Sequence, residues 1–276
     1  MAYAELTDVR SYYELVGEGE PLLLIPGLGG TCRVWDTIVP ELAAQFSLIL
    51  VDNRGIGRSV ARNKPRTLAD YSTDLVELLD ELQLDRAHVL GLSLGGIIAQ
   101  RFAVDHPSRV DRLVLVSCTH RFTAYLRGMA SLLGHSLRRF PKRVFVQTME
   151  LLGTAPLYLD ANEQEIEGLV GQRCREGLHA RAMAIQLRCL LGSEVDPDRY
   201  RIPAPTLVIS GEHDALIPNC YARLMAERIP GSRFVMIDGA GHNPMAEAPH
   251  AVLPLITRFL KGEEAEASYA PLARDR

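Results

Sequence analysis

The chain has 276 residues, of which 47% are hydrophobic and 23% charged, and its formal net charge is −4. These values describe a globular protein that is long enough to bury a large core, either as one large domain or as a domain with an insertion. The isoelectric point near 6.1 argues against nucleic acid as the main partner, because phosphate binding is driven by clustered positive charge.

The sequence also argues against a membrane protein and a secreted protein. No apolar run approaches the roughly 18 residues of a membrane helix, and the N-terminus, MAYAELTDVR, lacks the basic start and the apolar stretch of a signal peptide. The five cysteines form no CxxC pair and the eight histidines form no HExxH motif, so neither a disulfide framework nor a metal site is predicted. We therefore expect a cytoplasmic protein without a metal or a cofactor.

Short apolar segments alternate with helix-length amphipathic segments along most of the chain. This alternation predicts an α/β domain, doubly wound, with a mostly parallel sheet of about eight strands. The predicted strands, the first of them one arm of an opening hairpin, are Ser11–Val16, Pro21–Ile25, Ser47–Val51, Ala87–Leu92, Arg112–Ser117, Thr206–Ser210 and Arg233–Ile237. The predicted helices are Leu68–Leu82, Leu94–Val104, Cys220–Ile229 and about Pro249–Leu260, the last with a kink or a later start because of Pro254.

The alternation is interrupted once, over residues 120–200, which are typical of helices and turns. A structureless loop of this length is improbable in a compact domain, so we predict a helical lid inserted after the sixth strand. The core then comprises residues 1–119 and 201–261. Residues 262–276 contain four acidic and two basic residues, a pattern that predicts a flexible, solvated tail.

The segment Gly91-Leu92-Ser93-Leu94-Gly95 lies between a predicted strand and a predicted helix. A GxSxG string alone is weak evidence, but the strand–turn–helix context is that of a nucleophile on a tight, strained turn. Such a turn lifts the serine hydroxyl above the sheet and leaves no room for side chains two residues away on either side. We therefore predict Ser93 as a nucleophile.

A serine hydroxyl needs a base to accept its proton and a carboxylate to orient that base. In an open α/β sheet, functional groups gather beyond the carboxyl ends of the strands. Asp214 follows the strand Thr206–Ser210, and His242 follows the strand Arg233–Ile237. The chain order of serine, aspartate and histidine matches the order of nucleophile, acid and base in this architecture.

An acyl-transfer enzyme must also stabilise the oxyanion of its tetrahedral intermediate, and two backbone N–H groups can do so. The loop Pro26-Gly27-Leu28-Gly29-Gly30 follows a predicted strand. We assign the two donors of the oxyanion hole to the amides of Leu28 and Leu94. A plain glycine turn remains the alternative for this loop.

Five segments in this order resemble the α/β-hydrolase fold superfamily over residues 11–261: LIPGLGGTCRVWD, VDNRGIGRS, GLSLGGIIAQ, ISGEHDALIP and GAGHNPMAEAP. The resemblance implies the same roles for Ser93, Asp214 and His242, the same oxyanion donors, and a helical lid. Many members have His-Gly where this chain has Pro26-Gly27, which leaves the orientation of that loop open.

The resemblance also limits the chemistry. The motifs GLSLGG and DNRGIGRS are similar to those of the branch that contains enol-lactonases, small carboxylesterases and cofactor-free perhydrolases. Because haloalkane dehalogenases and epoxide hydrolases of this fold use aspartate where this chain has Ser93, those activities are disfavoured. The turn Asp52-Asn53-Arg54-Gly55 matches a structural turn of the family.

The first third of the predicted lid is basic: between Thr119 and Met149 there is no acid, and there are six bases. Such an entrance could attract an anionic substrate, whereas a solvated helix face is the plainer interpretation. Pocket residues are harder to predict than the triad, since packing explains them equally well. The candidates are Gly27, Cys32, Trp35, His120 and Arg121.

These observations predict a serine hydrolase that cleaves a carboxylic ester or lactone of a small molecule through a Ser93 acyl-enzyme. Two alternatives stay open: cleavage of a carbon–carbon bond or a thioester by the same triad, and a non-catalytic signalling protein that binds a small molecule. The expected partners are the small-molecule substrate, anionic if the basic lid attracts it, and a second copy of the chain in a homodimer. Neither nucleic acid nor a membrane is expected.

Overall fold

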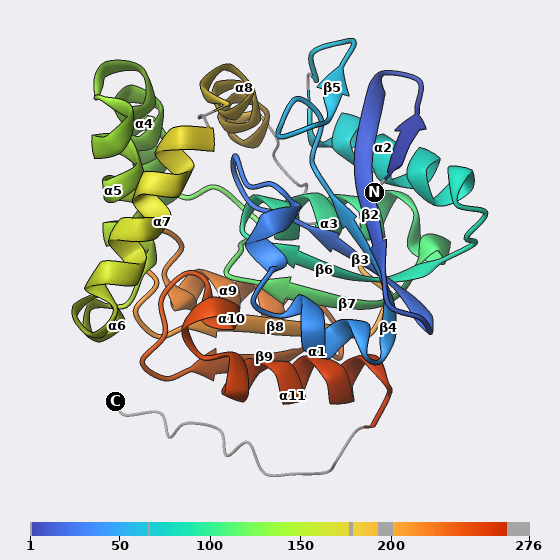
Figure 1. The fold of residues 1–276 in the computed structure, drawn as a ribbon. Coiled ribbons are helices and arrows are strands. Elements are labelled where there is room, and N and C mark those ends of the chain that lie inside the picture. The colour runs from blue at the N-terminus through green and yellow to red at the C-terminus, as the bar shows by residue number, and fades with distance from the viewer. Residues whose placement is uncertain (1, 66, 177–178, 193–200, 264–276) are drawn as a thin grey trace.

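The computed structural model describes residues 2–65, 67–176, 179–192 and 201–263. Its centre is a sheet in the order β1-β2-β4-β3-β6-β7-β8-β9, with a further short strand, β5, paired to β2 (Figure 1). The strands from β4 to β9 along this path are parallel, whereas β2 is antiparallel to β1, β4 and β5. The predicted doubly wound, mostly parallel sheet is therefore confirmed. The strands are β1 (Ala2–Glu5), β2 (Val9–Val16), β3 (Glu20–Ile25), β4 (Phe46–Val51), β5 (Val60–Ala61), β6 (Ala87–Leu92), β7 (Val110–Val116), β8 (Thr206–Gly211) and β9 (Arg233–Ile237).

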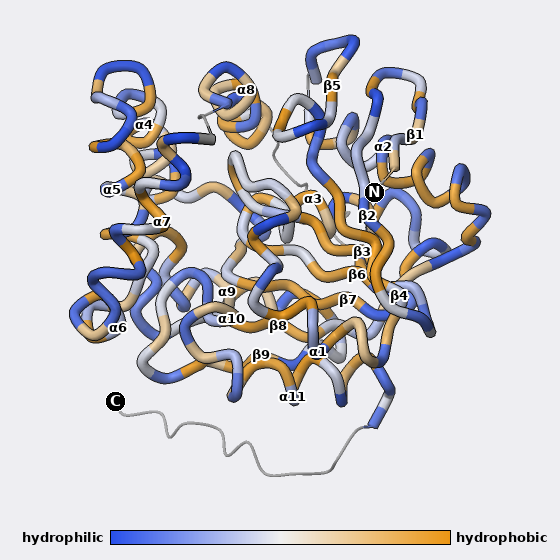
Figure 2. The backbone as a smooth tube through the Cα atoms, viewed as in Figure 1, coloured by the Kyte–Doolittle hydropathy of each residue, from blue (hydrophilic) through white to orange (hydrophobic). Residues whose placement is uncertain are grey.

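Helices cover both faces of the sheet because the strand side chains that point to either face are apolar. Along β3, Leu23 and Ile25 belong to one buried cluster, together with residues of α2 (Leu68–Glu81), α3 (Leu94–Asp105) and α9 (Asn219–Ala226). Leu22 and Leu24 belong to the opposite cluster, with α1 (Val39–Ala43) and α11 (Pro249–Leu260). Figure 2 shows these central strands as a hydrophobic layer. A strand that is buried on both faces reads as a continuous apolar run, which explains why the central strands were predictable.

Within the described part of the predicted lid, five helices lie between β7 and β8, and Figure 1 shows them beside the sheet. They are α4 (Ala124–Arg139), α5 (Lys142–Gly153), α6 (Pro156–Ala161), α7 (Glu163–Glu176) and α8 (Ala180–Leu191), and together they are called the helical insertion below. The end of the predicted lid, residues 193–200, and most of the predicted tail, residues 264–276, lie outside the described residues. Phe145, Val146 and Val170 of the insertion pack in a small third cluster, which also contains Ile56 from the segment after β4.

Three details differ from the sequence-based predictions. Strands β1 and β5 were not predicted, because each is short and is defined by its pairing with β2 rather than by its own sequence. Of the two alternatives predicted for the last helix, the later start is wrong, because α11 begins at Pro249 and continues through Pro254. A kink at Pro254 stays a prediction. Among the helices that the structure describes, none is long and apolar enough to cross a membrane.

Candidate active site

Ser93 occupies a strained turn between β6 and α3. Its backbone has φ 56° and ψ −119°, in the left-handed region that residues other than glycine rarely adopt. The flanking glycines allow this turn: a Cβ on Gly91 would lie 2.5 Å from the carbonyl oxygen of Gly95, and a Cβ on Gly95 would lie 1.9 Å from that of Ile25. The spacing predicted a turn without room for side chains, and the geometry agrees with this prediction.

The loop after β3 lies directly beside the serine. A Cβ on Gly27 would be 3.3 Å from the Cβ of Ser93 and 3.9 Å from its hydroxyl oxygen. The loop closes with a hydrogen bond from the N–H of Gly30 to the carbonyl of Gly27, 3.1 Å long. Within the described part of the chain, neither the Leu28 nor the Leu94 N–H donates a hydrogen bond. Both therefore remain available as donors next to Ser93, as an oxyanion hole requires.

Two side chains form hydrogen bonds with the backbone of this loop. The buried Asn53 side chain donates to the carbonyl of Pro26 (3.0 Å), so the turn after β4 holds the start of the loop. The fully buried Gln186 of α8 accepts from the N–H of Gly29 (3.0 Å). Gln186 was not among the predicted site residues, and no sequence motif marks it.

Asp214 and His242 come together at the carboxyl ends of β8 and β9. Oxygen Oδ2 of Asp214 is 2.8 Å from Nδ1 of His242, while Oδ1 accepts the backbone N–H groups of Leu216 and Ile217. The carboxylate is therefore held in place by its own turn, with its second oxygen aimed at the imidazole. Its side chain is fully buried, whereas that of His242 is 13% exposed.

The charge on Asp214 sets the basicity of His242. Burial by itself would lower the pKa of the imidazole, but the carboxylate charge and its hydrogen bond outweigh burial, so this pKa is raised. With Nδ1 engaged, Nε2 is the nitrogen left to accept a proton. The structure, over its described residues, has no hydrogen bond between His242 and Ser93. Such contacts are often long in ligand-free enzymes and shorten when substrate binds.

The helical insertion contacts the loops of the site directly. The Tyr125 hydroxyl of α4 donates to the carbonyl of Ala215, next to Asp214 (2.7 Å). The N–H of His242 donates to the carbonyl of Gly153, the last residue of α5 (2.6 Å). Together with the Gln186 contact, these bonds tie the insertion to the loops that carry Asp214 and His242 and to the loop after β3.

The other predicted pocket residues lie in different surroundings. Cys32 and Trp35 are almost fully buried in the cluster with α1 and α11, and Arg58 donates to the Cys32 sulfur (3.0 Å). His120 is buried, and burial, followed by the charges of Arg121 and Arg228, lowers its pKa to about 4. Arg121 is exposed. Of the predicted pocket residues only Gly27 has a described approach to Ser93, and the pocket role of the others stays a prediction.

Some charges of the basic segment are engaged within the insertion. Arg143 forms an ion pair with Glu167 of α7, and the Lys142 ammonium donates to the carbonyl of Cys174 at the end of the same helix. These two bases therefore join α5 to α7. This arrangement favours the plainer interpretation for two of the six positive charges.

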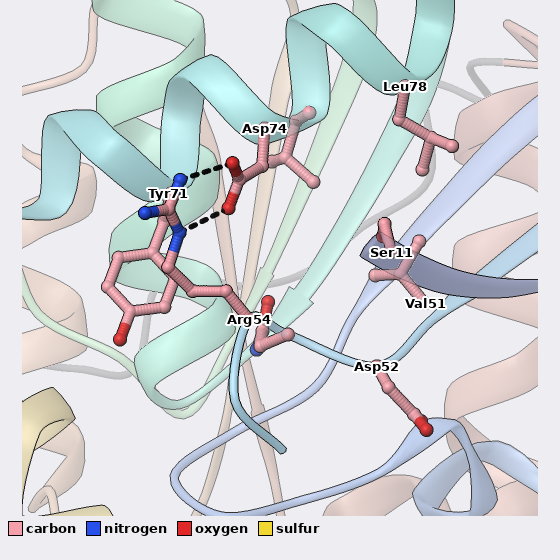
Figure 3. A pocket seen from close by; sticks show the side chains of 9 residues that line it. Ser11, Val51, Asp52, Arg54, Tyr71, Asp74 and Leu78 are labelled. Atoms are coloured by element: carbon pink, nitrogen blue, oxygen red, sulfur yellow. Dashed lines mark hydrogen bonds and ion pairs between the residues drawn. The ribbon is translucent and has the colours of Figure 1, made fainter. Parts of the chain in front are cut away.

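A small polar pocket lies away from Ser93, beside the turn that holds Asn53. Its main feature is the buried ion pair between Arg54 and Asp74 of α2 (Figure 3). The guanidinium Nε of Arg54 lies 2.6 Å from Oδ2 of Asp74. The lining residues are Ser11, Val51, Asp52, Asn53, Arg54, Tyr71, Asp74, Leu75 and Leu78. Arg54 also donates to the carbonyl of Asp70, so its guanidinium anchors the turn to α2. No group of three or more His, Cys, Asp or Glu side chains suited to a metal ion occurs among the described residues.

Comparison with known proteins places this geometry in a family. A protein of Caulobacter sp. strain K31, provisionally named carbamate hydrolase RutD, is 30% identical, and the alignment covers 92% of this chain and 97% of that protein. A hydrolase from Pseudomonas aeruginosa PA01 is similar in structure, with a TM-score of 0.84, 28% identity, and coverage of 94% of this chain and 97% of that chain. The enol-lactonase of Burkholderia xenovorans LB400 shares the fold, with a TM-score of 0.85, 23% identity, and coverage of 94% and 100%. The family model described as the alpha/beta hydrolase fold matches residues 20–249, and the chain therefore belongs to the α/β-hydrolase fold family.

Proposed function

We propose that the protein is a serine hydrolase that cleaves a carboxylic ester or lactone of a small molecule through a Ser93 acyl-enzyme. The observation that carries the proposal is the hydrogen bond between Asp214 and His242, at the same edge of the sheet as the strained Ser93 turn. A carboxylate that orients an imidazole toward a serine is the arrangement that activates a hydroxyl, and Ser93 is partly exposed.

The proposed reaction has two halves. In the first, the Ser93 oxygen attacks the substrate carbonyl carbon while its proton passes to Nε2 of His242, and the N–H groups of Leu28 and Leu94 stabilise the oxyanion. The intermediate then expels the leaving alcohol, which takes the proton from His242. In the second half, His242 removes a proton from water while the water oxygen attacks the acyl carbon. The bond between the acyl carbon and the Ser93 oxygen then breaks, the Ser93 oxygen takes the proton back from His242, and the carboxylic acid is released.

A carbamate is a second candidate substrate, because the relative from Caulobacter carries the name of a carbamate hydrolase. The same nucleophile and oxyanion donors serve both substrates, since each presents a carbonyl with a leaving group. They differ in reactivity: nitrogen donates electrons into the carbamate carbonyl and makes it less electrophilic. The enol-lactonase shares only the fold at 23% identity, so it supports the architecture more than the substrate.

The test is labelling with a fluorophosphonate probe, combined with turnover of a substrate panel. We expect the wild type to be labelled at Ser93 and to hydrolyse short-chain esters or lactones, and Ser93→Ala to do neither. Carbamates and esters with the same leaving group should be compared side by side, because their kcat/KM ratio separates the two candidates. A wild type that neither reacts with the probe nor turns over any member of the panel would refute the proposed function.

A further inference from the structure

The base loop and the helical insertion meet closely at Gly241. A Cβ on Gly241 would lie 2.5 Å from the carbonyl oxygen of Gly153 and 2.7 Å from the nitrogen of Ala155. The N–H of the next residue, His242, donates to that same Gly153 carbonyl. The backbone that carries the base therefore rests on residues 153–155, at the end of α5.

A single carboxylate oxygen bridges these two segments. Oε2 of Glu247, the last residue of α10 (Pro244–Glu247), accepts the N–H of Gly241 at 2.8 Å and the N–H of Ala155 at 2.9 Å. The contacts join residues that are 6 and 92 positions apart in the chain, so the side chain fixes a tertiary arrangement as well as a local turn. An ionised acceptor makes such bonds shorter and about twice as strong as a neutral one does.

Burial raises the pKa of Glu247, while the backbone hydrogen bonds and the charge of a protonated His242 act in the opposite direction. The imidazole faces two carboxylates, Asp214 through a hydrogen bond and Glu247 through space, and both raise its pKa. Tyr158 of α6, in the insertion, is an ionisable group whose pKa the charge of Glu247 helps to raise, after burial and Glu165. Two carboxylates therefore favour the protonated imidazole that forms when the serine gives up its proton.

We infer that Glu247 is a positioning residue for the catalytic base, holding the His242 loop against residues 153–155 of the insertion through one shared oxygen. This inference rests on the proposed function, because it assigns a role toward His242 as the base. The Glu247 carboxylate touches no reacting atom: it acts through the backbone on either side of the imidazole and through its negative charge.

Two substitutions separate geometry from charge. Glu247→Gln keeps an oxygen that can accept both N–H groups but removes the charge, whereas Glu247→Ala removes the acceptor as well. The exposed Glu227 at the end of α9 provides the matched control, Glu227→Ala. The readouts are the thermal midpoint, KM, the pH profile of kcat/KM, and kcat per active site, with the active sites titrated by the fluorophosphonate probe.

We expect Glu247→Ala to lower kcat per titrated site by up to about 100-fold, the effect of a misplacement near 1 Å, with little change in KM. We expect Glu247→Gln to recover most of kcat and to shift the acidic limb of the pH profile to lower pH, because a negative charge that raises the imidazole pKa is gone. Glu227→Ala should match the wild type.

The outcomes are separable. One outcome would mean a purely structural role and would overturn the inference. In it, Glu247→Ala has fewer titratable sites and a lower thermal midpoint but keeps the wild-type kcat per site, and Glu247→Gln shows an unshifted pH profile. If Glu247→Ala does not fold, the pH profile of Glu247→Gln decides: an unshifted profile with unchanged kcat contradicts the inference. Failure of the proposed function looks different, since the wild type itself would then neither label nor turn over.

Discussion

Gly95 offers the sharpest test of the geometry around Ser93, because its substitution by alanine adds one atom at a place with no space. The new Cβ would lie 1.9 Å from the carbonyl oxygen of Ile25 and 2.7 Å from that of Pro26, both of them backbone atoms. A Cβ essentially never approaches another atom within 3.0 Å, so the backbone must move by at least about 1 Å.

That movement separates the two proposed oxyanion donors, since Pro26 opens the loop that contains Leu28 while the added atom belongs to the helix that begins at Leu94. Overpacking of this kind typically costs about 1–3 kcal/mol of stability, and a misplacement of 1 Å near reacting groups can cost on the order of 100-fold in rate. We therefore expect Gly95→Ala to lose activity by more than its loss of stability explains.

The assay compares the free energy of unfolding in urea with kcat/KM per titrated serine. The matched control is Gly128→Ala, because Gly128 lies in α4, is exposed, and has no atom within 4 Å of the position of an added Cβ. That control should gain about 0.5–1 kcal/mol, as is usual for replacing glycine by alanine in a helix. A Gly95→Ala variant with wild-type stability and wild-type activity would show that the tight turn described for Ser93 is not the one present in solution.

The remaining predictions concern three different parts of the molecule. Asp214→Asn should lower kcat by roughly 10⁴-fold, because an amide can hold the imidazole in the wrong tautomer. In the wild type, kcat/KM should fall as the pH drops through the raised pKa of His242, since only the neutral ring accepts a proton. Gln186→Leu removes the acceptor that holds the oxyanion loop and should lower kcat by about tenfold, the equivalent of one lost hydrogen bond; an unchanged kcat would show that the loop does not depend on α8. Asp74→Ala leaves Arg54 buried and unpaired and should cost about 3–5 kcal/mol in urea unfolding, whereas the double variant Arg54→Met with Asp74→Leu should be much less destabilised; equal losses in the single and double variants would contradict this reasoning.

The basic segment of the insertion is the reason for the hypothesis that the substrate is anionic, which these variants do not test. Arg143 and Lys142 of this segment interact with α7. Arg127 lies in the first turn of α4, where its guanidinium donates to the carbonyl of Phe122. Comparing kcat/KM for neutral and anionic esters at low and high salt would reveal electrostatic attraction, because screening weakens it.

Much of the fold and of the candidate site could be predicted because the signals are local. The central strands are continuous apolar runs, and the turn at Ser93 needs glycines at Gly91 and Gly95 whatever the rest of the chain does. Asp214 and His242 could be located because the carboxyl ends of parallel strands meet at one edge of a sheet. These inferences need only the positions of the strands along the chain, and the alternation of apolar segments with helix-length segments indicates those positions.

Only the tertiary structure reveals the contacts that hold this site together. Gln186 lies 157 residues from the Gly29 N–H that it accepts, and Glu247 lies 92 residues from the Ala155 N–H that it accepts. The Gln186 contact has no sequence signal, because a glutamine on a helix is equally common on a solvated surface. Glu247 belongs to the segment GAGHNPMAEAP, which resembles the family, but that segment does not indicate which N–H groups the carboxylate accepts. Their importance comes from burial beside backbone N–H groups that need acceptors, and which N–H groups are buried is decided by how the insertion packs on the sheet.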